Sequence, residues 1–122
     1  MATENPFENC AQTIKDAAET VKPRHWYSGD TANKHGAAKV LSNLSDTVTT
    51  TGEKYADSQD VLSLKIALDT CRKNFRAEQE RWTSGYFKGA FTAASQALDT
   101  LEETLDIKNN PRIQKLFPPK AG

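Results

Sequence analysis

Residues 61–105, which read VLSLKIALDTCRKNFRAEQERWTSGYFKGAFTAASQALDTLEETL, contain the clearest pattern in the chain. Apolar residues recur there every three or four positions, which is the spacing of one face of an α-helix. In the second half they follow a heptad repeat, which is typical of helices that pack side by side. The two stripes comprise Val61, Leu64, Leu68, Cys71, Phe75 and Trp82, interrupted at Glu78, and then Phe87, Phe91, Ala94, Leu98, Leu101 and Leu105. The pattern therefore predicts two long amphipathic helices.

A break is expected between these two helices, at the sequence TSGY of residues 83–86. A single helix through the whole pattern would far exceed the usual length of about 11–12 residues. Ser84 can cap a new helix and Gly85 weakens an existing one, so we expect a helical hairpin. The first helix of the hairpin is expected to begin at Asp57 or Ser58, either of which can cap it.

Another helix is predicted near the N-terminus, where Asn5 precedes Pro6 and Glu8 follows three positions after Asn5. Asn is a preferred capping residue, Pro is tolerated in the first turn, and the Glu side chain can reach back to the cap. Pro23 disfavours helical geometry at the residue before it, so we expect this helix to end near Val21. Its apolar stripe consists of Phe7, Cys10, Ala11, Ile14, Ala17, Ala18 and Val21.

The remaining helix follows the loop and has the weakest pattern of the four. Asp30 or Thr31 can cap its start, and Gly52 is expected to end it. Gly36 and the three threonines at 49–51 lower its helix propensity, so packing against other helices has to stabilise it. Its stripe consists of Ala37, Val40, Leu41, Leu44 and Val48.

Four amphipathic stripes joined by short connections predict an all-α fold. With 122 residues, we expect one domain over residues 1–122, a bundle of about four helices with a long C-terminal hairpin. Pro111 is expected to end the last long helix. Within the tail, residues 111–122, a short turn is expected to pack Ile113, Leu116 and Phe117 on the bundle, and the rest is expected to be partly flexible.

Composition argues against several classes of function. Sixteen basic residues balance sixteen acidic ones, so the broad positive field of a nucleic-acid binder is missing. No apolar run approaches the ~20 residues of a membrane span, and the start MATENPFENC does not resemble a signal peptide. Two widely spaced cysteines on apolar stripes are typical of buried reduced thiols. We therefore expect a cytoplasmic protein.

The two cysteines and two histidines are the candidates for catalysis or metal binding. A nucleophilic pair would need Cys10 or Cys71 beside His25 or His35, yet both cysteines fall on predicted core stripes. These four residues have no metal-ligand spacing either. We therefore expect no enzyme activity, no metal and no cofactor, and a small Cys/His-dependent enzyme remains the alternative.

The loop that contains HWYSGD, residues 25–30, is the best candidate for a binding site. Trp, Tyr and Arg dominate protein-binding hot spots, and three consecutive ring-bearing residues cannot all point into one small core. In the competing interpretation these rings cover the open end of the core. The candidate partner-binding residues are Arg24, His25, Trp26, Tyr27 and Asp30.

Two other surfaces offer alternatives to this loop. The basic tail, with Lys108, Arg112, Lys115 and Lys120, could contact an anionic membrane surface as an adaptor. A bundle this small can also leave apolar area uncovered, which a two-fold copy in a homodimer would hide. The leading hypothesis is nevertheless a non-enzymatic protein that binds one protein partner.

The segment RHWYSGDTANKHGAAKVLSNL, residues 24–44, leads from the aromatic loop into the following helix. In this segment and in its small all-helical build, the chain resembles helical modules of Legionella Dot/Icm type IV secretion effectors. The family includes small inhibitors that bind a ubiquitin transglutaminase and its paralogous deamidase. The resemblance implies an effector that inhibits or regulates a partner protein and reaches a host cell without an N-terminal signal peptide. No defining motif is matched, so no functional residue is carried over.

The predicted hairpin is also similar to a second family, the secreted helical hairpins that carry Trp-x-Gly between two helices. Here the corresponding sequence is WTSG at residues 82–85, which is one residue too long. Two further helices are predicted as well, so we expect the chain to lie outside that family.

Overall fold

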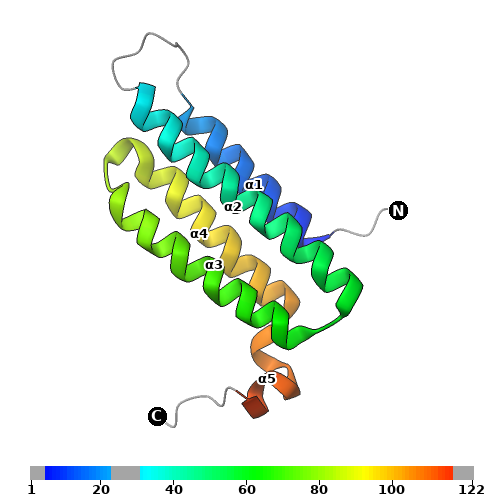
Figure 1. Ribbon diagram of the computed structural model, residues 1–122. Helices are drawn as coiled ribbons and strands as arrows, with labels where there is room; N and C mark the ends of the chain where they lie inside the picture. Colours follow the sequence, from blue (N-terminus) through cyan, green and yellow to red (C-terminus); the bar gives the residue numbers. More distant parts are fainter. Residues whose placement is uncertain (1–4, 23–30, 117–122) are drawn as a thin grey trace, which may run out of the picture.

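The computed structural model describes residues 5–22 and 31–116 and shows a bundle of long helices. The described residues contain no β-strand, so the all-α prediction is confirmed. Four long helices lie side by side, and a short helix follows at one end of the bundle (Figure 1). The elements are α1 (Pro6–Val21), α2 (Thr31–Ser58), α3 (Val61–Arg81), α4 (Gly85–Leu105), a 3₁₀ turn η1 (Ile107–Asn109) and α5 (Pro111–Leu116).

Side-chain caps fix where most of these helices begin. The Asn5 side chain accepts hydrogen bonds from two backbone N–H groups of α1, and Ser84 accepts one from α4, both as predicted. The cap of α3 is Asp60, whose carboxylate accepts from the N–H groups of Leu62 and Ser63. The prediction that α3 begins at Asp57 or Ser58 is therefore wrong by a few residues, because the preceding helix continues through both positions.

The prediction that Gly52 ends α2 is wrong. A Cβ atom at this position would lie 2.6 Å from Cγ of Phe7, so the glycine allows the ring of Phe7 to contact the α2 backbone. The helix ends only after Ser58, where Gln59 adopts the left-handed conformation with φ of 54°. The N–H of Gln59 donates to the carbonyl of Tyr55 at 2.8 Å. This bond provides a partner for one of the carbonyl groups at the helix end, which have no partner within the helix.

The end of α4 also differs from the prediction. Asp106 adopts a left-handed conformation, with φ of 54°, and ends the helix before Pro111. Pro111 instead begins α5, a position where its missing N–H costs nothing. In α5 Ile113 is buried as expected, whereas Leu116 is 51% exposed, and Phe117 lies outside the described residues.

Small and large side chains give the two halves of the bundle different spacing. Helix α1 packs closely against α2 and α4, where alanines such as Ala18 and Ala94 are fully or almost fully buried. Helix α3 lies further from α4, and the gap is filled by the stacked rings of Phe75 and Phe91, whose centroids are 5.5 Å apart. The predicted hairpin of α3 and α4 therefore forms, but large side chains hold its two helices apart. Between α1 and α2, by contrast, the buried hydroxyl of Ser45 donates directly to the carbonyl of Ala11 at 2.8 Å.

An ion pair that the sequence did not reveal joins α3 to α4. Arg72 approaches Asp99 at 2.5 Å and Glu102 at 3.5 Å. Burial raises the pKa of the Glu102 carboxyl, although the Arg72 guanidinium opposes this shift. On the exposed side of α3, Lys65 pairs with Asp69. The Arg72 ion pairs thus connect α3 and α4, two helices that do not pack closely.

The contact between Phe7 and Gly52 can be tested by adding one methyl group. We expect Gly52→Ala to lower the free energy of unfolding, because overpacking costs about 1–3 kcal/mol whereas the gain in helix propensity is about 1 kcal/mol. The matched control is Gly89→Ala in α4, where a Cβ meets nothing within 4 Å. That change should raise the free energy of unfolding by about 0.5–1 kcal/mol. Urea denaturation of both variants measures the difference, and equal gains in stability would contradict the close contact.

Candidate functional site

Two helix connections meet at one end of the bundle. The C-terminal end of α1 and the N-terminal end of α2 lie there, next to the turn between α3 and α4 (Figure 1). The predicted partner-binding residues Arg24, His25, Trp26, Tyr27 and Asp30 belong to the segment between α1 and α2 and lie outside the described residues. Their role stays a prediction.

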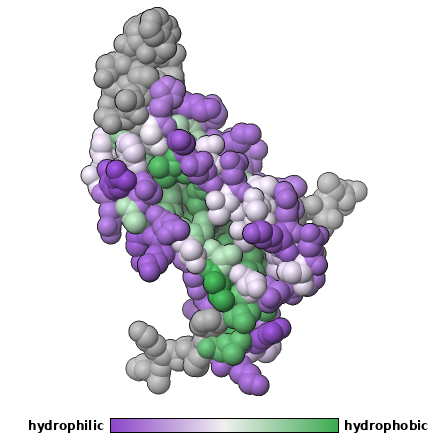
Figure 2. Space-filling model, in the orientation of Figure 1, coloured by the Kyte–Doolittle hydropathy of each residue, from purple (hydrophilic) through white to green (hydrophobic). Residues whose placement is uncertain are grey.

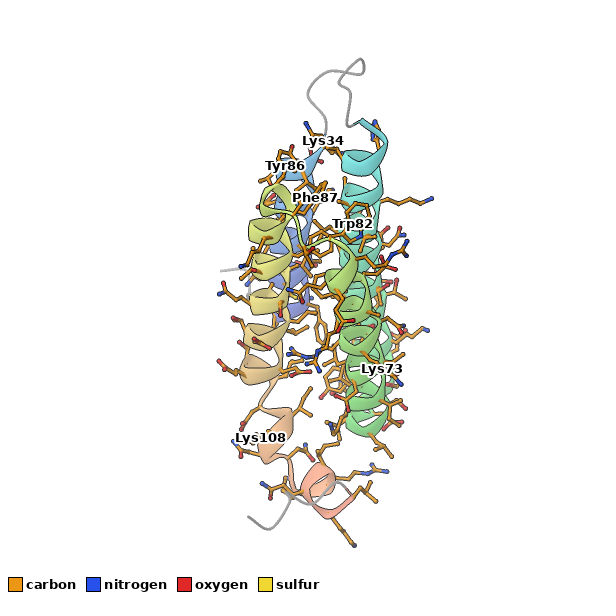
Figure 3. The ribbon with its side chains drawn as sticks, turned by 90° about the vertical axis from the view of Figure 1, so that its left-hand side faces the viewer. Lys34, Lys73, Trp82, Tyr86, Phe87 and Lys108 are labelled. Atoms are coloured by element: carbon orange, nitrogen blue, oxygen red, sulfur yellow. The ribbon has the colours of Figure 1, made fainter. Side chains whose placement is uncertain are left out.

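The described residues at this end form a cluster that the sequence prediction did not include. We call it the aromatic end and define it as Lys34, Trp82, Tyr86 and Phe87 (Figure 3). Phe87 is the central ring, because the centroids of Trp82 and Tyr86 each lie 5.1 Å from it in edge-to-face arrangements. Trp82 also packs on Phe91 of the core at 6.4 Å. The aromatic end is therefore continuous with the hydrophobic core.

Two helical positions, Gly36 and Glu78, surround Trp82. A Cβ at Gly36 of α2 would lie 3.1 Å from Cη2 of Trp82, so the glycine lets the ring lie close to the α2 backbone. The indole Nε1 lies 3.4 Å from a carboxylate oxygen of Glu78, to which it donates. Glu78, the residue that interrupts the apolar stripe of α3, thus lies beneath the indole as its hydrogen-bond acceptor. Its other oxygen lies 3.6 Å from a guanidinium nitrogen of Arg81.

Tyr86 differs from Trp82 in being 48% exposed. It is the second residue of α4, after the turn capped by Ser84. The ammonium group of Lys34 in α2 lies 4.8 Å from the centre of its ring, within the range of a cation–π interaction. A large aromatic side chain is thus exposed to solvent yet fixed by a ring on one side and a cation on another.

Exposed basic side chains flank the aromatic end in the sequence. Arg81 and Lys88 lie within a few residues of Trp82 and Tyr86 and are exposed, as is His35 next to Lys34. Among the described residues, the ion pairs of this region involve only Arg81, with Glu78. The aromatic end can therefore offer apolar contact area together with several hydrogen-bond donors and positive charges.

The two cysteines differ from a catalytic nucleophile in their burial and in the direction of their pKa shifts. Both are buried and neither forms a disulfide. Burial, together with the neighbouring Cys71, raises the pKa of Cys10 to about 12. Burial also raises the pKa of Cys71, against the effect of the Arg72 guanidinium. His25, the partner in the enzyme hypothesis, lies outside the described residues.

The described residues show neither a metal-binding cluster nor a membrane-spanning helix. Within residues 5–22 and 31–116, no three His, Cys, Asp or Glu side chains come together in a way that could hold a metal ion. None of the described helices combines the length and apolar composition that crossing a bilayer requires. The surface with the most distinctive chemistry thus remains the aromatic end.

Parts of this cluster are visible in the sequence. Trp82 and Phe87 lie on predicted apolar stripes, with a predicted turn at Ser84 between them. The signal that could have found the site is the position of Trp82, Tyr86 and Phe87 on both sides of one short turn. The contribution of Lys34 could not be read in the same way, because it comes from a distant helix.

The raised pKa values of the thiols predict slow reaction with a disulfide reagent in the folded protein. The thiolate is the reacting species, and near pH 8 a thiol with a pKa of about 12 is almost entirely protonated. We expect both thiols to react quickly in urea and slowly in buffer, with a native rate that rises as the pH is raised. A fast native reaction at neutral pH would contradict the assignment and favour the Cys/His enzyme.

A bundle of α-helices is compatible with many unrelated functions, so the fold alone does not assign one. No protein-family model, curated protein or solved structure matches this chain. The resemblance to Legionella effectors stays a prediction. The function has to be inferred from the chain's own residues.

Proposed function

We propose that this chain is a non-enzymatic protein-binding module that uses the aromatic end to bind one protein partner. The observation that carries the proposal is Tyr86, which is half exposed although it is fixed between Phe87 and Lys34. An aromatic side chain held in this way loses little conformational freedom when a partner covers it. The loop with Arg24, Trp26 and Tyr27 lies outside the described residues and is proposed as a further binding segment.

The chemistry of the aromatic end supports a protein as the ligand. Trp, Tyr and Arg are enriched in binding hot spots, and Trp82, Tyr86 and Arg81 are present here. Exposed polar groups from the turn and from Lys88 can form the outer part of such an interface. The basic character of these groups favours a partner surface that carries carboxylates.

Regulation or inhibition of the partner is the action that this surface can perform. A binding module changes its partner by covering a surface or by selecting one of its conformations. Within the described residues, neither thiol has the lowered pKa of an activated nucleophile. The buried, protonated thiols favour this mode over chemistry at Cys10 or Cys71. An inhibitor or regulator of a partner protein is therefore the proposed role.

The proposal is tested with Tyr86→Ala in an affinity capture from the native host, followed by titration of the purified partner. We expect the dissociation constant to rise about thirtyfold, which corresponds to about 2 kcal/mol. The melting temperature should hardly change, because Tyr86 is half exposed and its truncation leaves no buried cavity. Trp26→Ala tests the loop in the same titration.

The matched control is Asp46→Ala on α2, an exposed position outside the aromatic end. This variant should bind the partner as the unchanged protein does. A captured partner that binds Tyr86→Ala and Trp26→Ala with unchanged affinity would contradict the proposed surface. Trp82→Ala is less informative, because loss of its contacts with Phe87 and Phe91 is expected to destabilise the fold as well.

A further inference from the structure

A groove of about 640 Å³ lies at the other end of the bundle, between α3, α4, η1 and α5. Its lining includes three buried apolar residues, Leu68, Ile107 and Ile113, from three different elements. Lys108, which also lines the groove, is far from the aromatic end (Figure 3). Figure 2 shows hydrophobic side chains gathered on this face of the molecule and down to α5. The groove is therefore a separate surface with an apolar floor.

One wall of the groove carries an acidic stripe from α4. Asp99, Glu102 and Glu103 follow each other at positions i, i+3 and i+4, which places these three carboxylates on one side of α4, and Asp106 follows at the end of the helix. Arg72 compensates Asp99 and Glu102. Five carboxylates and two lysines, Lys65 and Lys108, line the groove, so its lining is acidic overall. An occupant of the groove should thus present both apolar area and positive charge.

The exposed side of α5 has this combination of properties. Arg112, Lys115 and Leu116 occupy positions i, i+3 and i+4, so they share one side of the helix, and all three are exposed. Arg112 lies close enough to lower the pKa of Asp60, but it forms no ion pair within the described residues, and neither does Lys115. The buried residue of α5 is Ile113, on a different side. This exposed side therefore does not contact the groove of its own chain.

We propose that a second copy of this chain occupies the groove and that the protein forms a two-fold symmetric dimer. In such a dimer each copy offers the same patch, so the acidic stripe of one meets the basic side of α5 of the other, twice. Leu116, which is 51% exposed, would lie on the apolar floor of the partner's groove. Lys115 would lie opposite Glu103 and Asp106.

Covering this patch removes apolar area that is otherwise in contact with water. Leu116 is about half exposed, at 51%, and Val61 and Leu62 at the start of α3, the helix that α5 contacts, are only partly buried. Exposed apolar residues that gather on one face are typical of interaction surfaces. The charges add the specificity, because the patch is complementary to its own copy and repels a misaligned one. The dimer does not depend on the proposed function, which uses the opposite end of the bundle.

The dimer is tested by charge reversal at Glu103 and Lys115, two exposed residues. Light scattering after size exclusion should give about twice the 13.5 kDa of one chain at micromolar concentrations. Glu103→Lys alone and Lys115→Glu alone should each raise the dimer dissociation constant at least about tenfold, because like charges then face each other in both contacts. An equimolar mixture of the two variants should form a dimer again, since both contacts regain opposite charges.

The control is Asp46→Lys, which reverses an exposed charge on α2 and should leave the dimer unchanged. Circular dichroism of each variant checks that the fold is retained. A mass of 13.5 kDa throughout the micromolar range would overturn the proposal, as would charge-reversed variants that dimerise like the unchanged protein. A monomer that binds vesicles containing anionic lipid, and loses this binding with Lys115→Glu, would also overturn it and assign the basic face of α5 to a membrane surface.

Discussion

Two aromatic rings pack directly against the backbone of α2, one near each end of the helix. Phe7 contacts Gly52 and Trp82 contacts Gly36, and at both places a Cβ atom would lie closer to the ring than ordinary packing allows. The first contact fixes the start of α1 on α2, and the second fixes the turn between α3 and α4 on the same helix. Since α2 has the lowest helix propensity of the four, these contacts and the rest of the packing have to stabilise it. Contacts with α2 therefore position both ends of the bundle.

The spacing of the helices explains where the surfaces of interest occur. Alanines bring α1 close to α2 and α4, although a second groove remains between α1 and α4. Helix α3 lies further away, and its space is filled by Phe75, Phe91 and Trp82 towards the aromatic end. Towards the other end Leu68 and Leu64 are smaller than these rings. There η1 and α5 place Ile107 and Ile113 near Leu68 of α3, and the groove remains between these elements and α4. One gradient in side-chain size therefore accounts for both ends.

Periodicity predicted the helix class, the number of long helices and most of the buried positions, because burial of one stripe depends mainly on spacing. It failed where a contact between distant residues decides the outcome. Gly52 has the local chemistry of a helix end, but its packing against Phe7 keeps it inside α2. Asp106 ends α4, although in the sequence Pro111 is the stronger signal for a helix end. For the site, the rings around Ser84 were visible in the sequence, whereas Lys34 and Arg72 gain their roles only from neighbouring helices.

The two ends of the bundle differ in the kind of contact they can make. At the aromatic end the rings are fixed from several directions, so a partner meets a surface that is already ordered, with positive charge around it. At the groove end the carboxylates of α4 and the cations of α5 lie in one patch, which can satisfy itself in a symmetric pair. Because a long helix separates the two surfaces, occupation of one leaves the other accessible. A dimer built at the groove would therefore carry two aromatic ends, and a partner with two matching sites would gain affinity through avidity without any new contact.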